Sequence, residues 1–247
     1  MSNFKILTPY ISNFSISSAS GFDSSLTAGY GARRDRLSCT SATTAAYIQI
    51  NLSTATAVDT LYIANLDLSC RLIDPTDLVV TVKGSSDVAF GTSEDLTFNV
   101  GLADLVGRNS RDYITALTFT TSYQYYRVQI SGASNKWACG KIWLGSAIDL
   151  GSPYIQMKVD RAKRQEGDQE ELREFRIKFF GITATAQNSY YEKIEKYKTF
   201  SDLILWDSDN SVFTNSETVI YGKLISNRKE IRAAQFYDLE LSVREAY

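Results

Sequence analysis

The sequence predicts a mainly β protein, in which an N-terminal antiparallel β-sandwich of the jelly-roll type precedes a smaller α+β domain. Three observations support this prediction. Short runs of β-branched and aromatic residues alternate with turn residues through the first half of the chain. Only one segment, in the second half, has the apolar spacing of an amphipathic helix. The content of charged residues rises abruptly near residue 150, which indicates a change of domain.

The domain boundary follows from length and composition. A chain of 247 residues is long enough for two domains that each bury a core. Residues 1–150 contain 11 basic and 12 acidic residues, whereas the shorter segment 151–247 contains 15 and 16. Glycine and proline interrupt regular structure at Gly151-Ser152-Pro153, inside a predicted linker at 146–153. We therefore expect a jelly-roll domain at 1–148 and an α+β domain at 149–247.

The first domain contains five strand candidates. In the first of them the side chains of Tyr47, Gln49 and Asn51 alternate with aliphatic ones, and Arg127 and Gln129 repeat this pattern in the last. A period of two predicts strands with one face in the core and the other in solvent. Several such strands without a helical period are typical of an antiparallel sandwich. The candidates are 46–52, 60–64, 78–83, 114–119 and 125–130.

The second domain begins with two alternating segments, 155–159 and 175–179, which predict a long antiparallel hairpin. The segment between them, 160–171, is rich in charged residues, so we expect an exposed turn there. Strands at 218–225 and 236–244 close the domain.

One helix is expected between these strand pairs, within 183–200. Tyr190, Ile194 and Tyr197 have the i, i+4 and i+7 spacing of an amphipathic helix. The predicted order is therefore β-β-α-β-β. A sheet covered by one helix is the simplest arrangement that buries the apolar faces of these elements.

The charge balance and the apolar pattern exclude several classes of partner. The formal net charge is -2, which provides no attraction to a nucleic-acid backbone or to anionic lipid. No stretch has the roughly 18 apolar residues that cross a bilayer, and the polar N-terminus lacks the apolar core of a signal peptide. We therefore expect no nucleic-acid binding, no membrane insertion and no export by a signal peptide.

The reactive side chains point away from catalysis. Cys39, Cys70 and Cys139 are an odd number without CxxC spacing, so we expect buried thiols in a reducing cytoplasm. The absence of histidine removes the commonest general base, the commonest zinc ligand and every Ser-His or Cys-His pair. We therefore expect no catalytic residue, no metal site, no cofactor and no enzymatic activity. A glycoside hydrolase that uses two carboxylates is the remaining enzymatic alternative.

Two short motifs carry a family resemblance. The run Tyr125-Tyr126-Arg127-Val128-Gln129-Ile130, followed by Cys139-Gly140-Lys141-Ile142-Trp143-Leu144-Gly145, resembles the closing strands of galactose-binding-like, discoidin-type jelly rolls in phage tail proteins. With Gly84-Ser85-Ser86, this similarity covers roughly 1–145. The run Ile220-Tyr221-Gly222-Lys223-Leu224 resembles the C-terminal part of the same bacteriophage tail-tip proteins.

The resemblance implies a structural protein of the virion, at the distal end of a phage tail. Its implied partners are other copies of this chain, in a homo-oligomeric ring of roughly three or six, and the tail-tube, hub and tape-measure proteins. The implied location is the virion tail, assembled in the cytoplasm of the host bacterium. The domain order departs from that of the distal tail proteins, in which the ring-forming domain usually comes first. The exact position in the tail therefore stays open.

Polar side chains of the second domain are candidates for contacts between protomers. The polar hairpin of the second domain would reach a neighbouring protomer in a ring. The assembly residues expected there are Arg161, Lys163, Arg164, Glu166, Asp168 and Glu170.

The alternative function is a carbohydrate- or host-receptor-binding module of the virion. Jelly rolls of the kind that the sequence resembles bind sugars through loops at one end. Aromatic rings can stack on a sugar there, and guanidinium groups can donate hydrogen bonds to its hydroxyls. The candidates for such a site are Tyr30, Arg33, Arg34 and Trp137.

Overall fold

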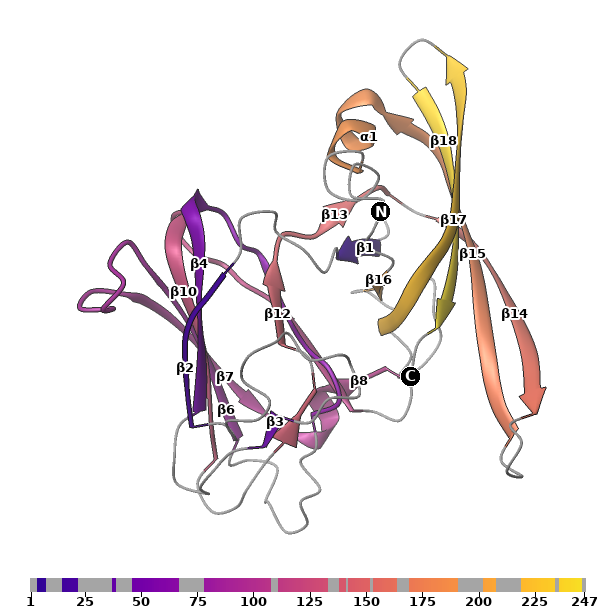
Figure 1. Cartoon of the computed structure of the whole chain (residues 1–247). Coiled ribbons are helices and arrows are strands. Elements are labelled where there is room, and N and C mark those ends of the chain that lie inside the picture. The colour runs from indigo at the N-terminus through magenta and orange to yellow at the C-terminus, as the bar shows by residue number, and fades with distance from the viewer. Residues whose placement is uncertain are drawn as a thin grey trace. The chain divides into compact units, whose positions relative to one another are not determined.

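The structure is a computed structural model of the chain, and it divides into two compact units (Figure 1). The sandwich unit is Ile11–Ser146, and the long-strand unit is Met1–Tyr10 together with Ala147–Tyr247. The residues that the structure describes are 4–7, 15–21, 37–38, 46–66, 78–107, 111–132, 138–140, 142–151, 153–163, 169–190, 202–207, 219–233 and 236–245.

The sandwich unit consists of antiparallel sheets. A five-stranded sheet has the order β2-β4-β10-β6-β7, a four-stranded sheet has the order β12-β5-β9-β8, and β11 pairs with β3 (Figure 1). The strands are β2 (Ser15–Ser20), β3 (Leu37–Ser38), β4 (Ala46–Thr56), β5 (Thr60–Ile63), β6 (Leu78–Ser85), β7 (Glu94–Val100), β8 (Leu105–Val106), β9 (Asp112–Ala116), β10 (Tyr123–Gly132), β11 (Ala138–Cys139) and β12 (Ile142–Gly145). A 3-10 turn at Leu102–Asp104 precedes β8.

The core of this unit is built from the apolar half of each alternating strand. In the central strand β10, Tyr126, Val128 and Ile130 are fully buried. They join residues of both sheets in one hydrophobic cluster, which contains for example Ile50 of β4 and Leu61 of β5. The prediction of a mainly β chain with an antiparallel sandwich is therefore confirmed.

The long-strand unit is one antiparallel sheet of order β13-β1-β16-β17-β18-β15-β14 with a single described helix (Figure 1). Its elements are β1 (Phe4–Leu7), β13 (Ile148–Asp149), β14 (Tyr154–Lys163), β15 (Gln169–Thr183), α1 (Ala184–Tyr190), β16 (Asp202–Asp207), β17 (Val219–Ala233) and β18 (Phe236–Glu245).

Helix α1 packs on one face of this sheet. Tyr190 is fully buried in the cluster that contains Phe179 and Leu239, and its hydroxyl accepts a hydrogen bond of 3.1 Å from Asn227 Nδ2. Tyr190 thus occupies the buried face that the helical spacing predicted. The other two residues of that pattern, Ile194 and Tyr197, lie outside the described residues.

The expected exposed turn at 160–171 is shorter than predicted. The ladder between β14 and β15 continues to the pair Lys163–Gln169, so most of the charged segment is strand. Polar sequence does not prevent this, because an antiparallel ladder satisfies the backbone hydrogen bonds whatever the side chains are. Residues of opposite charge also lie at opposed positions, as Arg161 and Glu171 do.

The first ten residues group with the C-terminal part of the chain, whereas the predicted boundaries placed them in the sandwich. The reason is strand pairing. β1 lies between β13 and β16, with Ile6 opposite both Ile148 and Leu205. Both Ile6 and Leu7 are completely buried. Strand β16 is also additional to the predicted order β-β-α-β-β.

Candidate functional site

Half of the predicted assembly residues and all of the predicted sugar-site residues lie outside the described part of the chain. Of the assembly residues, Arg161, Lys163 and Glu170 lie in the paired strands β14 and β15, where the backbone is described. The others fall outside, namely Arg164, Glu166, Asp168, Tyr30, Arg33, Arg34 and Trp137.

The connection between β6 and β7 is a loop with several internal hydrogen bonds, and it carries several hydroxyl groups. Asp87 accepts hydrogen bonds from the backbone N–H groups of Ala89 and Gly91, at 3.0 and 3.3 Å. Ser85 Oγ donates to the carbonyl of Thr92 at 2.7 Å and accepts from the N–H of Asp87 at 3.0 Å. The loop therefore closes on itself at both ends, and its shape is set before any ligand binds.

The turn between β9 and β10 is tied to this loop through Glu94. The Glu94 carboxylate accepts hydrogen bonds from the Thr120 N–H at 3.0 Å, the Thr120 hydroxyl at 2.9 Å and the Tyr123 hydroxyl at 2.9 Å. Desolvation acts to raise the pKa of Glu94, but these hydrogen bonds outweigh it and hold the pKa below its usual value. The bond to Glu94, together with desolvation, raises the pKa of Tyr123. Glu94 is therefore an ionised acceptor at neutral pH.

An open hollow of about 580 Å³ lies between the loop and the turn. Its lining residues are polar by type, but apolar atoms make up most of the surface that they expose in it, and Tyr123 is the aromatic residue among them. The lining residues are Ser85, Ser86, Asp87, Thr92, Ser93, Glu94, Thr120 and Tyr123. The side-chain hydroxyls of Ser86 and Thr92 make no hydrogen bond to any residue in the described ranges. We call this feature the end hollow, because the strands β6, β7 and β10 begin or end at it.

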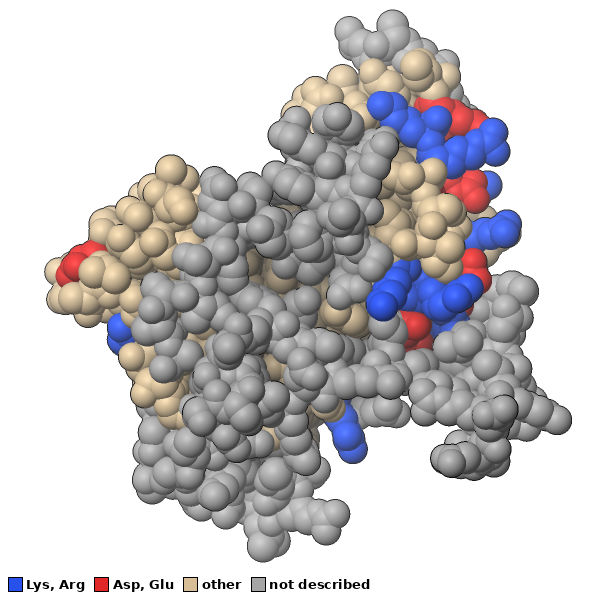
Figure 2. Space-filling model, viewed as in Figure 1, with Lys and Arg blue, Asp and Glu red and all other residues tan. Residues whose placement is uncertain are grey.

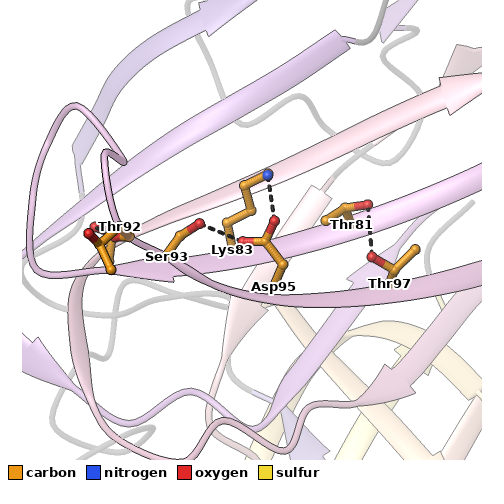
Figure 3. Close-up of polar contacts among 7 residues, drawn as sticks. Thr81, Lys83, Thr92, Ser93, Asp95 and Thr97 are labelled. Carbon is orange, nitrogen blue, oxygen red and sulfur yellow. Dashed lines mark hydrogen bonds and ion pairs between the residues drawn. The ribbon is translucent and has the colours of Figure 1, made fainter.

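The outer face of the five-stranded sheet adjoins the end hollow and is polar (Figure 3). Lys83 Nζ on β6 lies 2.5 Å from Asp95 Oδ2 on β7, and Ser93 Oγ donates to the other oxygen of Asp95 at 2.6 Å. One row further along, the hydroxyls of Thr81 and Thr97 are 3.4 Å apart. These side-chain contacts link β6 and β7 on the solvent-facing side of the sheet.

A stacked arginine lies on the same face. The guanidinium carbon of Arg127 lies 4.4 Å from the ring centre of Tyr47 and 4.3 Å from that of Phe90. Arg127 Nε and Nη2 both donate to Gln49 Oε1, at 3.2 and 2.6 Å. The amide nitrogen of Gln49 in turn donates to the carbonyl of Val88, at 3.1 Å. The β6–β7 loop therefore contributes to the end hollow and also covers Arg127.

In the long-strand unit, the sheet face opposite the buried Tyr190 is charged. Lys178 pairs with Glu240 at 3.0 Å and Arg228 with Glu230 at 2.6 Å. Phe180 beside them is 55% exposed. Basic and acidic side chains alternate over β17 and β18 (Figure 2). A small hollow of about 130 Å³ lies among these residues.

Sequence reasoning missed the end hollow and the stacked arginine. Two signals pointed to them: Glu94 is the only glutamate in the first 150 residues, and Arg127 is a cation in the middle of a tyrosine-rich strand. Within the described residues, no group of three acidic or cysteine side chains is arranged to hold a metal ion. No described helix has the length and apolar character needed to cross a membrane.

No protein-family model matches this sequence, and no curated protein matches it. Two solved structures of sugar-binding modules are similar to the chain. One is chitosan-binding module 1 of a chitosanase/glucanase from Paenibacillus sp. IK-5, with 17% identity and a TM-score of 0.35, over 54% of this chain and 93% of the module.

The other similar structure is the CBM32 module of AlyQ in complex with 4,5-unsaturated mannuronic acid. It has 17% identity and a TM-score of 0.34, over 56% of this chain and 97% of the module. The matched part is about half of this chain and nearly all of each module. The sugars named for the two modules are ligands of those modules.

Proposed function

We propose that this chain is a carbohydrate-binding protein without catalytic activity, and that the sandwich unit binds a glycan in the end hollow. The observation that carries the proposal is the lining of this hollow. The hydroxyls of Ser86 and Thr92, which have no partner among the described residues, line it together with the ionised acceptor Glu94. Each sugar hydroxyl both donates and accepts hydrogen bonds, so a hydroxyl-rich lining with one aromatic side complements it.

Two further features of the end hollow favour binding. Its volume of about 580 Å³ falls within the range of roughly 300–1,000 Å³ that is typical of ligand sites. The hydrogen bonds within the β6–β7 loop hold Asp87 in place, which lowers the entropic cost of ordering the site on binding.

The carboxylates of the hollow favour binding without turnover. A glycosidase needs a carboxylic acid whose raised pKa lets it protonate the leaving oxygen. The pKa of Glu94 is lowered instead, so this group does not have the environment of a general acid. Asp87 accepts two backbone hydrogen bonds that hold the loop.

The test uses the full chain on an array of immobilised glycans, with the double variant Ser86→Ala/Thr92→Val beside the wild type. These hydroxyls have no described protein partner, so we expect unchanged folding and binding weaker by about tenfold or more. Thr97→Val is the matched control, because Thr97 lies on the same sheet outside the hollow. Absence of glycan binding, or equal binding by the double variant, would refute the proposal.

A second candidate function, a structural component of a phage tail tip, is favoured by one feature of the long-strand unit. Strand β14 is at the edge of the seven-stranded sheet, and no strand within the described ranges pairs with its outer side. An unpaired edge is a template for pairing with another chain. The proposed partners are further copies of this chain and other tail proteins, and the proposed location is the virion tail.

This second candidate is tested by light scattering of the purified chain at low and high concentration. Ring formation predicts a defined multiple of the 27.6 kDa chain mass that does not grow further with concentration. A monomer at every concentration would contradict self-assembly of this chain alone.

A further inference from the structure

Arg127 lies near the centre of the outer face of the five-stranded sheet, in the middle strand β10. Gln49 lies opposite it on β4, and Lys83 lies opposite it on β6. Asp95 lies opposite Lys83 and pairs with it at 2.5 Å. This row therefore holds two cations and one anion, and the anion pairs with Lys83.

The Arg127 side chain is fixed in one orientation. Rings of Tyr47 and Phe90 stack on the guanidinium, and Gln49 Oε1 accepts from two of its nitrogens. Arginine has five N–H donors, so three of them lack an acceptor among the described residues. The stacked rings restrict access to the guanidinium faces, and the remaining donors lie at its edge. The edge is the part that binds two oxygens of a carboxylate or of a tetrahedral oxyanion in a fork.

A second arginine shows how this chain satisfies a purely structural guanidinium. Arg173 of the long-strand unit is 6% exposed, and its Nε and Nη2 donate to the two oxygens of Glu245, both at 2.6 Å. Arg173 also lies over the ring of Phe175. The environment of Arg127 has aromatic stacking of the same kind, but an amide oxygen takes the place of the carboxylate.

We propose that Arg127 is an anion-binding site that takes the carboxylate or sulfate group of an acidic glycan. Half-buried polar side chains lie beside it on the same face, where they can bind the hydroxyls of that sugar; Tyr125 and Gln129 are examples. This inference rests on the proposed carbohydrate-binding function and names the class of glycan. Its site is distinct from the end hollow, since Arg127 is not among the residues that line it.

The probes are polygalacturonate, its fully methyl-esterified form, dextran sulfate and dextran, each offered to the full chain. We expect the wild type to bind an acidic polymer and not its neutral counterpart. Arg127→Gln is expected to weaken this binding by about tenfold or more, and Arg127→Lys by an intermediate factor because it keeps the charge and loses the fork. Lys83→Gln is the matched control: it removes a charge from the same row and should change binding by less than about twofold.

The outcomes distinguish a carboxylate ligand from a sulfate ligand, and the anion site from the end hollow. Loss of polygalacturonate binding in Arg127→Gln identifies a carboxylate ligand, and loss of dextran sulfate binding identifies a sulfate ester. Equal losses in Arg127→Gln and Lys83→Gln, or none in either, would overturn the inference. If Arg127→Gln does not fold, the loss of acidic-polymer binding in Arg127→Lys is compared with the loss in Lys83→Gln. A larger loss in Arg127→Lys supports the anion site, and equal losses overturn it. If a neutral glycan binds and its binding depends on Ser86 and Thr92 but not on Arg127, only the end hollow is a binding site. If an acidic glycan binds and its binding depends on Arg127 but not on Ser86 and Thr92, only the anion site is one.

Discussion

At the scale of single residues, Glu94 joins two connections that are distant in sequence. It begins β7, and its carboxylate accepts hydrogen bonds from Thr120 in the β9–β10 turn and from Tyr123 at the start of β10. The Tyr123 ring packs edge-on against Phe119 and Tyr126 in the core. Glu94 therefore links both sides of the end hollow to the core.

Glu94→Gln gives a pH-dependent prediction. The folded-state pKa of Glu94 lies below its ordinary value of 4.5, so the ionised group stabilises the fold fully above that pH. The stabilisation is lost as the pH falls through the lowered pKa. The difference in thermal stability between the wild type and Glu94→Gln should therefore be largest at neutral pH and should shrink as the pH falls below 4.5. A difference that stays constant through this acid range would show that the charge of Glu94 has no role.

The burial of single side chains was more predictable than their contacts. Trp143 and Trp206, which lie in apolar stretches of the sequence, are 2% and 8% exposed. The solvent-facing position of Arg127 also followed from alternation. Its contact with Gln49 did not, because the two residues are 78 positions apart and only the pairing of β10 with β4 brings them together.

At the scale of elements, β6 and β10 approach closely beside the end hollow. A methyl group on Gly84 would lie 2.8 Å from Cε2 of the Tyr123 ring, which is closer than real contacts allow. Gly84→Ala should therefore displace Tyr123 and destabilise the sandwich unit by about 1–3 kcal/mol, as overpacking in a core does. It should also weaken glycan binding. Urea unfolding and the glycan array measure the two effects.

The control for this substitution is Gly91→Ala, in the loop on the other side of the end hollow. Its nearest contact would be Asp87 Oδ2 at 3.4 Å, an ordinary distance. A surface change of this kind costs less than about 0.5 kcal/mol. Equal stability of Gly84→Ala and Gly91→Ala would contradict the close packing of Tyr123 against β6.

Elements with clear alternation were predictable, and elements with mixed patterns were not. β6 and β10 extend the predicted strands by a few residues only. β7 was missed because Glu94, Asp95 and Asn99 are residues that strands disfavour, although its outer positions are solvated. The charged parts of β14 and β15 were assigned to a turn for the same reason. Cross-strand pairing decides such cases, and a single sequence does not reveal it.

At the scale of the whole molecule, the first ten residues complete the sheet of the long-strand unit. Removal of residues 1–10 takes β1 away from β16 and removes the fully buried Ile6 and Leu7. Each of these side chains contributes about 1.5–3 kcal/mol through burial, so the long-strand unit should lose several kcal/mol of stability. Calorimetry of the truncated chain should show a lower melting temperature for this unit and an unchanged transition for the sandwich unit. A lower melting temperature of the sandwich unit, with an unchanged transition of the long-strand unit, would show that β1 belongs to the sandwich.

The change in composition predicted two domains divided near residue 149, and it gave no indication that the N-terminus groups with the C-terminal part of the chain. β1 is only four residues long, and its partner β16 lies about 200 positions further along. Composition reports on stretches of sequence and not on such distant pairing. The candidate site was hidden for a similar reason, since the end hollow joins residues 85–94 with Thr120 and Tyr123.

The most direct test of carbohydrate binding is the signal of the full-length wild type on the glycan array, measured beside Ser86→Ala/Thr92→Val and Thr97→Val. We predict at least one bound glycan, a loss of about tenfold or more in the double variant, and wild-type binding by Thr97→Val. An array on which the folded wild type binds nothing, or on which the three proteins bind alike, would contradict the claim that the end hollow is a glycan site.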